Sequence, residues 1–160
     1  MIILINGSIN AGKTTVARIL AKKILNVALV EVDVIRNMIK WMTIGESVPI
    51  NLENAISATR NFTKRGLNVI VPYPLSQKNY DYVLGGLKDL DTKIYTFTLA
   101  PKIEKALTNR GARELDDSER ERIKYHYKIG IHTLVFGEVI DNSEQTPEET
   151  AEIILSKIEN

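Results

Sequence analysis

The segment from Gly7 to Thr14 reads GSINAGKT and combines the residue types and the spacing that triphosphate binding requires. It matches the pattern G-x-x-x-x-G-K-[ST] at every fixed position. Gly7 and Gly12 let the backbone curl so that successive N–H groups point at phosphate oxygens. Lys13 would reach the β- and γ-phosphates, and the Thr14 hydroxyl would join the coordination of Mg²⁺. The other interpretation is a chance match in a glycine turn, with Lys13 an ordinary surface lysine.

The segments on either side of this loop have the pattern that a phosphate-binding loop requires, a strand before it and a helix after it. Residues 2–5 form an apolar run of strand type, and residues 13–24 repeat apolar side chains at three- and four-residue spacings, as a helix does. The amino end of that helix would add partial positive charge beside the phosphates. The residues predicted to bind the nucleotide, ATP with Mg²⁺, are Gly7, Asn10, Ala11, Gly12, Lys13, Thr14 and Thr15.

Further apolar runs of strand length follow, and segments with a helical pattern separate them. The predicted strands are 2–5, 27–32, 67–71, 94–99 and 134–140, and the predicted helices are 13–24, 34–42, 51–65, 76–90, 102–109, 118–131 and one that begins at Thr146. Apolar strands that alternate with helices indicate a parallel sheet covered on both faces. The sequence therefore predicts a single three-layer α/β domain over residues 1–160, with a five-stranded parallel sheet.

Composition excludes several classes of protein. The chain is 44% hydrophobic and 26% charged, which is typical of a folded globular protein. With 21 Lys and Arg against 20 Asp and Glu, the net charge of +1 predicts neither a nucleic-acid partner nor a membrane partner. The absence of cysteine excludes disulfides, Cys-ligated zinc and thiol catalysis. No apolar run reaches the roughly 18 residues of a membrane span and the start is unlike a secretion signal, so we expect a cytoplasmic monomer or homodimer.

Two classes of triphosphate-binding protein compete: a guanine-nucleotide switch, and an enzyme that transfers the γ-phosphoryl group to a small molecule. A switch normally carries D-x-x-G and N-K-x-D, but no aspartate here has a glycine three residues later and no Asn-Lys pair exists. A motor ATPase is disfavoured by the chain's size and by residues 71–74, VPYP, where an acidic Mg²⁺ anchor would usually follow a strand. The same departure leaves open a regulatory protein that binds nucleotide without transferring phosphate.

Phosphoryl transfer needs an acceptor site beside the loop and a cationic lid that excludes water. Residues 110–117, RGARELDD, supply arginines for such a lid. With the loop and the short chain, this segment resembles the nucleoside monophosphate kinase superfamily, and most of all its shikimate kinase and chloramphenicol phosphotransferase type. The resemblance covers the whole chain in element order and implies a sheet order of 2-3-1-4-5 with a short helical lid at about 110–122.

The resemblance also implies roles for three arginines of this lid. Arg110 would stack on the adenine, and Arg113 and Arg122 would contact the transferring phosphate, with Arg113 acting in catalysis beside Lys13. A planar guanidinium group suits both tasks, because it stacks on rings and bonds phosphate oxygens in pairs.

The acceptor is expected to bind in the region of residues 33–65. Asp33 follows the second predicted strand, and the carboxyl ends of parallel strands open onto the ligand crevice. The resemblance implies that a carboxylate here takes the acceptor's proton or helps hold Mg²⁺, and the alternative is a helix N-cap. Arg36 would bind a polar or anionic acceptor group unless it is simply solvated, and Trp41 would line a pocket for a ring unless it packs in the core. Arg60 is predicted to face the same cleft.

The two histidines and the segment 141–143 are less informative about function. His126 and His132 have no metal-like partners in the sequence, so both are expected to be structural. Residues 141–143, DNS, follow the fifth predicted strand, where folds of this type cradle adenine through the backbone, although turn propensity explains them equally well.

The sequence as a whole predicts an ATP-dependent, Mg²⁺-requiring phosphotransferase that acts on a hydroxyl of a small metabolite or antibiotic-like molecule. Lys13, Asp33 and Arg113 are its predicted catalytic residues, and Thr14 and Asp33 are its predicted metal ligands. A nucleoside or nucleoside monophosphate kinase is the first alternative, since it differs only in the acceptor pocket. A nucleotide-binding regulatory protein is the second.

Overall fold

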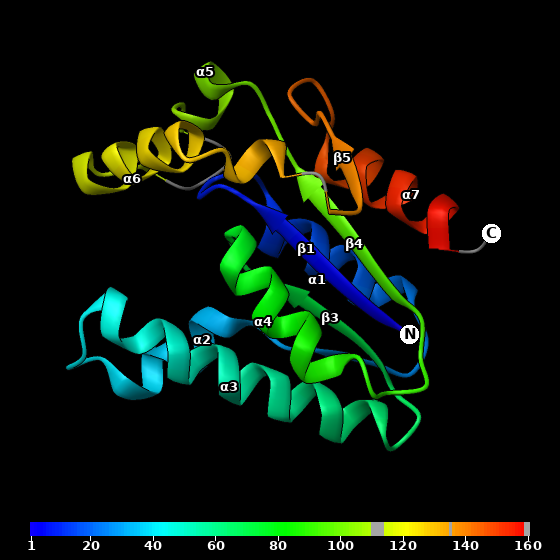
Figure 1. The fold of residues 1–160 in the computed structure, drawn as a ribbon. Helices are drawn as coiled ribbons and strands as arrows, with labels where there is room; N and C mark the ends of the chain where they lie inside the picture. The colour runs from blue at the N-terminus through cyan, green and yellow to red at the C-terminus, as the bar shows by residue number, and fades with distance from the viewer. Residues whose placement is uncertain (110–113, 135, 159–160) are drawn as a thin grey trace.

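The computed structural model describes residues 1–109, 114–134 and 136–158, and Figure 1 shows its elements. The strands are β1 (Ile2–Gly7), β2 (Val27–Leu29), β3 (Asn68–Pro72), β4 (Ile94–Leu99) and β5 (Glu138–Ile140). The α-helices are α1 (Lys13–Lys23), α2 (Val32–Arg36), α3 (Ile44–Thr63), α4 (Gln77–Leu87), α5 (Ile103–Ala106), α6 (Asp117–Lys128) and α7 (Pro147–Ile158), and the 3₁₀ turns are η1 (Asn37–Ile39) and η2 (Ile131–Thr133).

The five strands form one parallel sheet in the order β2-β3-β1-β4-β5, which confirms the predicted sheet and its order. β1 lies at the centre, where Leu4 is opposite Val71 of β3 and Thr96 of β4. The chain fills one side of β1 first and the other side afterwards, so the carboxyl end of β1 is a topological switch point. Open α/β sheets bind their ligands at such a point. The Gly7–Thr14 loop leaves the sheet there.

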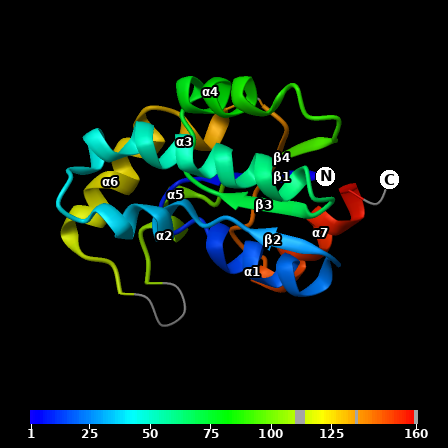
Figure 2. The same cartoon turned by 90° about the horizontal axis from the view of Figure 1, so that it is seen from below.

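Helices cover both faces of the sheet because its central strands are apolar on both faces. Along β1, Ile2 and Leu4 pack into one core cluster, and Ile3 and Ile5 pack into the other. All four are fully buried. Figure 1 shows α3 and α4 on one face of the sheet, with α1 and α7 on the other, and Figure 2 shows the same three layers from below. Among the described helices, none combines the length and the apolar character needed to cross a membrane.

Helices α5 and α6 lie at the carboxyl edge of the sheet, above the loop. Their small core consists of Ala106, Leu115 and Ile123, and Ile9 of the loop packs against it. The segment that carries the predicted lid is therefore in contact with the loop that it would cover.

The segment after β2 differs from the prediction. β2 ends at Leu29 and α2 begins at Val32, so Asp33 lies in the first turn of a helix rather than directly after a strand. Glu31 is the N-cap of α2, so the N-cap role considered for Asp33 is wrong. Val30 and Val32 are apolar because they pack into the core, and an apolar run alone does not distinguish a strand from such a connection.

Helix α3 begins earlier than predicted, at Ile44. Thr43 and Glu46 form a capping box, in which the Thr43 hydroxyl accepts from Glu46 N and the Glu46 carboxylate accepts from Thr43 N. Pro49 lies inside the helix and hid this start, because proline usually interrupts a helical pattern. The extra turns bring α3 to the carboxyl edge of the sheet, where it packs against α2.

Strand β5 is shorter than predicted because Gly137 and η2 precede it. Gly137 has φ +81°, and a Cβ built on it would lie 2.0 Å from the backbone oxygen of Thr96. Only glycine therefore allows the chain to approach β4 closely enough to begin the strand at Glu138.

We expect Gly137→Ala to lower the free energy of unfolding by about 3 kcal/mol, because the new methyl group meets backbone and the left-handed conformation is strained. Gly45→Ala is the matched control, since nothing lies within 4 Å of a Cβ built on Gly45 in α3. That change should raise the free energy of unfolding by about 0.5–1 kcal/mol. Urea unfolding measures both, and a Gly137→Ala protein as stable as the wild type would contradict the packing described here.

Candidate functional site

The loop between β1 and α1 has the backbone shape that phosphate binding requires. Gly7 has φ +142°, and a Cβ there would lie 2.5 Å from the backbone oxygen of Leu99, so the close approach to β4 needs glycine. Gly12 has φ +92° and is the N-cap of α1, with no side-chain hydrogen bond capping the helix. The first turn of α1 thus opens toward the loop with its N–H groups uncapped by a side chain, as an anion site requires.

Asn6, the last residue before the loop, fixes the end of β1. Its side chain is fully buried and donates hydrogen bonds to Thr98 Oγ1 at 3.1 Å and to Ile131 O at 3.2 Å. Its Oδ1 accepts from the backbone N of Leu75 at 2.7 Å. One amide thus joins β1 to β4, to η2 and to the segment after β3.

Two more asparagines hold the loop itself. Asn10 has φ +61°, and its Nδ2 donates to Ala106 O at 2.8 Å and to Thr108 O at 2.9 Å. Asn142, which follows β5, donates to Ala11 O at 3.0 Å. Asn10 is one of the residues predicted to bind the nucleotide, and residues 141–143 were considered for backbone contacts with the adenine. In the structure both asparagines anchor the loop backbone to neighbouring segments.

Lys13 and its two neighbours occupy the first turn of α1. The Lys13 Nζ bends back and donates to Ser8 O at 2.7 Å, so the ammonium lies over the loop. Thr14 is half-buried and Thr15 is exposed. The Lys13 ammonium and the hydroxyl groups of Thr14 and Thr15 therefore all lie at the amino end of α1, next to the loop.

His126 of α6 contacts the loop, which its sequence context did not predict. It is buried, and its Nδ1 lies 3.3 Å from Ser8 Oγ and 3.4 Å from Ile9 N, which donates to it. Burial, together with the positive charges of Lys13 and Arg122, lowers the pKa of His126 to about 4. The imidazole is therefore neutral near pH 7, and it accepts a hydrogen bond without adding charge to the loop.

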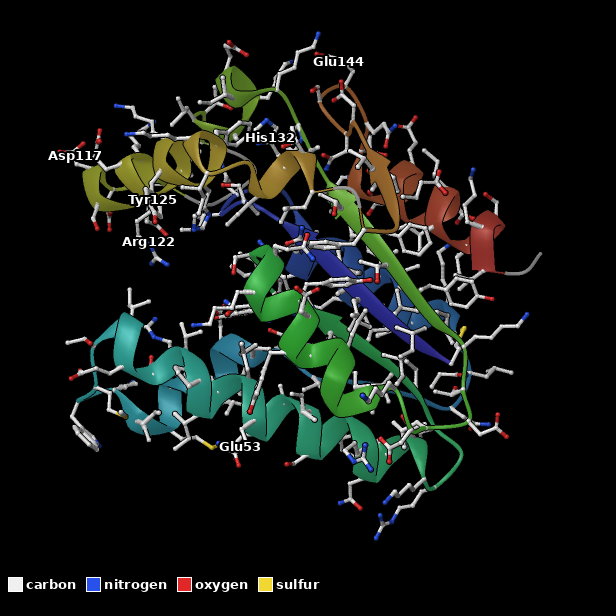
Figure 3. All side chains as sticks on the ribbon, viewed as in Figure 1. Glu53, Asp117, Arg122, Tyr125, His132 and Glu144 are labelled. Carbon is white, nitrogen blue, oxygen red and sulfur yellow. The ribbon has the colours of Figure 1, made fainter. Side chains whose placement is uncertain are left out.

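A second set of charges meets around Tyr73, just beyond β3. Burial raises the pKa of Tyr73 and the Asp33 carboxylate raises it further, whereas Arg122 and Arg36 act in the opposite direction. Three charged groups from α2 and α6 therefore act on one hydroxyl at the carboxyl edge of the sheet. Figure 3 shows Arg122 and Tyr125 on the side of α6 that is turned toward α2 and α3.

Of the predicted site residues, Arg122 therefore belongs to both sets of charges: it acts with Asp33 and Arg36 on Tyr73, and with Lys13 on His126. His126 and Tyr73 are additional members of the candidate site. The buried polar contacts of His126 were invisible in the sequence, because they depend on a pairing across 118 positions. Tyr73 was noted only as part of the VPYP segment, which lacks an acidic residue. His132 stacks on Tyr127 with ring centroids 4.3 Å apart, as expected of a structural residue.

Two predicted acceptor residues lie elsewhere. Arg60 binds Asp89 through both terminal guanidinium nitrogens and donates to Gly86 O at 2.7 Å, so it joins α3 to the end of α4 and does not face the predicted cleft. Trp41 is 84% exposed, so it neither packs in the core nor lines an enclosed pocket. Arg110 and Arg113 lie outside the described residues.

An open hollow of about 580 Å³ lies between the segment after β4 and α7. Four carboxylates and Lys102 are among the groups that line it, so its charge is unfavourable for a triphosphate; the carboxylates are those of Asp141, Glu144, Glu149 and Glu152. Within the described residues, no set of three or more His, Asp or Glu side chains is grouped to hold a metal ion. We therefore place the candidate site at the loop and not in this hollow.

Comparison with known proteins identifies the architecture. No protein-family model matches the chain, and no curated protein sequence matches it. Solved structures do match over nearly the whole chain. The tunicamycin resistance protein of Deinococcus radiodurans is 20% identical, with a TM-score of 0.68 over 98% of this chain and 94% of that one. Shikimate kinase from Bacteroides thetaiotaomicron is 16% identical, with a TM-score of 0.66 over 100% and 99%.

The APS kinase of Mycobacterium tuberculosis, solved in complex with AMPPNP and APS, is 14% identical, with a TM-score of 0.68 over 99% of this chain and 97% of that chain. The chain has the fold of the P-loop kinases. Identities this low establish the P-loop kinase fold alone. The choice of substrate must be argued from the residues of the site.

The lowered pKa of His126 predicts how the free energy of unfolding depends on pH. Its pKa in the folded protein is lowered from 6.5 to about 4, so between these pH values the unfolded chain binds a proton that the folded protein does not. We therefore expect the wild type to lose about 3 kcal/mol through this group as pH falls from 6.5 to 4. His126→Asn should lack this component and fall less steeply. Urea unfolding at a series of pH values measures the difference, and equal slopes for the two proteins would show that His126 is not held neutral.

Proposed function

We propose that this protein transfers the γ-phosphoryl group of ATP to a hydroxyl of a small molecule. One arrangement carries the proposal: the loop meets the uncapped first turn of α1 with Lys13 bent back over it, and α2 and α6, which carry Asp33 and Arg122, lie at the same edge of the sheet (Figure 1). Cations for a phosphate and a carboxylate for a hydroxyl would thus both be available at the carboxyl edge of the sheet. Phosphoryl transfer needs this combination.

The donor site is assigned to the loop. Its backbone N–H groups and the amino end of α1 would bind the phosphates, and Lys13 would move from Ser8 O to the β- and γ-phosphate oxygens. Arg122, which lies on α6, would neutralise charge on the transferring group. Arg113 is proposed to act with it, and Arg110 to stack on the adenine. The APS kinase with the same fold was solved with AMPPNP, an ATP analogue, which supports ATP as the donor.

The residues at the loop also fit a magnesium ion. A Mg²⁺ ion that is shared with bound phosphates would be coordinated by the half-buried Thr14 hydroxyl, next to the loop that Gly7 and Gly12 shape. Asp33 is the carboxylate that we assign to the same ion. When bound, Mg²⁺ would neutralise charge on the phosphate oxygens. The residues at the end of β3 and just after it, Val71, Pro72 and Tyr73, include no acid. The assignment of a carboxylate to the magnesium ion therefore depends on Asp33.

Asp33 is also the group proposed to orient the acceptor. The acceptor oxygen forms a bond to the γ-phosphorus while the bond to the bridging oxygen of ADP breaks, and the hydroxyl proton passes to the Asp33 carboxylate. Arg36, one turn along α2, would bind a polar or anionic group of the acceptor. Metabolites, antibiotic-like molecules and nucleosides all remain within this proposal.

The proposal is tested by measuring ADP release from ATP across nucleosides, nucleotides, shikimate-like acids, sugars and antibiotics. A kinase responds to one chemical class of acceptor. A protein that binds ATP and shows no acceptor-stimulated ADP release would instead fit the regulatory alternative.

Lys13→Ala should reduce turnover on the order of 10²-fold or more while the fold remains intact, because it removes a cation from the developing phosphoryl charge. Lys22→Ala, an exposed lysine on the same helix, is the control and should leave turnover unchanged. The measurement is steady-state ADP release, with circular dichroism to check the fold. Near-normal turnover in Lys13→Ala would rule out the proposed mechanism.

Asp33→Asn should lower turnover far more than it lowers ATP affinity, because the amide neither accepts the hydroxyl proton nor carries charge for a metal. Asp91→Asn removes an exposed carboxylate that lies before β4, at the opposite edge of the sheet, and serves as the control. Comparison of turnover with the calorimetric affinity for ATP separates the two effects. An unchanged rate would remove Asp33 from the reaction.

A further inference from the structure

Asn51 of α3 is fully buried, and neither its Nδ2 nor its Oδ1 makes a hydrogen bond within the described residues. Buried side-chain amides normally have partners, because a donor or acceptor that loses water without replacement costs free energy. An amide buried in this way is understandable if a ligand completes its hydrogen bonds.

The direction of Asn51 follows from the faces of α3. Ile56 lies against Gly86, so that edge of the buried stripe is turned toward α4. Ser47 and Asn51, one turn apart, occupy the opposite edge of the buried stripe, and because α2 also packs against α3, we infer that this edge is turned toward α2. Ser47 donates to Ile44 O at 3.0 Å and is satisfied, whereas Asn51 is not. Figure 1 shows this half of α3 beside α2, the helix that carries Asp33.

The segment that covers this edge is weakly held. Val32 is the only buried residue of α2, and η1 buries none of its residues. Met38 and Trp41, which follow, are 77% and 84% exposed. A segment with so few buried apolar contacts belongs to the part of a fold that opens at low free-energy cost. Its displacement would give an acceptor access to the Asn51 amide.

We propose that Asn51 binds the acceptor and recognises a neutral group that offers a hydrogen-bond donor and an acceptor side by side. This inference rests on the proposed function, since it places the ligand in the acceptor site. The amide presents an NH₂ donor and an oxygen acceptor together. A carboxylate or phosphate would leave the oxygen unpaired, and an ammonium group would leave the NH₂ unpaired. Adjacent hydroxyls of a sugar, or the amide edge of a nucleobase, satisfy both.

The protein contains one tryptophan, Trp41, so intrinsic fluorescence reports on the covering segment. Wild-type protein with MgATP is titrated with glucose and ribose in one arm, and with adenosine and thymidine in the other. We expect one arm to shift the Trp41 emission. Asn51→Leu should weaken that response at least tenfold and leave the calorimetric affinity for MgATP unchanged. Asn51→Ala, which fits without steric conflict, should behave in the same way.

Thr63→Val is the matched control. Thr63 Oγ1 is also buried without a partner within the described residues, but it lies about 18 Å further along α3. Both Asn51→Leu and Thr63→Val should raise the melting temperature, because each removes an unpaired polar group, and only Asn51→Leu should weaken probe binding.

Three results would overturn the inference: unchanged probe affinity in Asn51→Leu, no response of the wild type to any of the four probes, or a lower melting temperature in both Asn51 variants. Failure of the proposed function is a separate result. In that case a probe binds and shifts the emission, and no ADP is formed from ATP.

Discussion

The arrangement of this site depends on one constraint: the backbone between β1 and α1 must hold a conformation that an ordinary chain avoids. Gly7, Asn10 and Gly12 all have positive φ, a conformation that glycine adopts readily but that costs free energy for Asn10, so that contacts must offset the cost there. Three asparagine side chains provide hydrogen bonds that hold the loop, namely those of Asn6, Asn10 and Asn142. A loop held in this way meets a phosphate group without first having to become ordered, and preorganisation of this kind strengthens binding and catalysis.

The two sides of the candidate site differ in how firmly they are held. The loop leaves the end of β1, which is fully buried at the centre of the sheet and whose end Asn6 fastens to neighbouring segments. The opposite side consists of α2 and η1, which bury little and carry Asp33 and Arg36. This difference suits the proposed reaction, because the donor phosphates need a fixed cradle and the acceptor needs an entrance that closes to exclude water.

Much of the fold was predictable from the sequence, because apolar strand-length runs and a glycine-rich turn are local signals. The loop and the five parallel strands were confirmed, and the sheet order came from a family resemblance that the strand pairing then confirmed. The errors arose where local and tertiary causes conflict. Val30 and Val32 read as strand because they are buried, and Pro49 concealed a helix that a capping box begins.

The predicted site was less accessible to sequence reasoning than the fold. Lys13 and Thr14 follow from a local motif, and Asp33 follows from the order of elements. Arg60 looked like a ligand-binding residue, but its partner Asp89 lies 29 positions away and appears only in the folded chain. The contact of His126 with Ser8 and the unpaired amide of Asn51 likewise have no local signature, since each depends on helix packing.

The proposed function and the proposed role of Asn51 both require that the loop binds the phosphates of a nucleoside triphosphate. Calorimetric titration of the purified protein with ATP in the presence of Mg²⁺ tests it most directly. We expect saturable binding of one ATP per chain, with AMP binding far more weakly because it lacks the β- and γ-phosphates. Absence of ATP binding at millimolar concentration, or equal affinity for AMP and ATP, would contradict it.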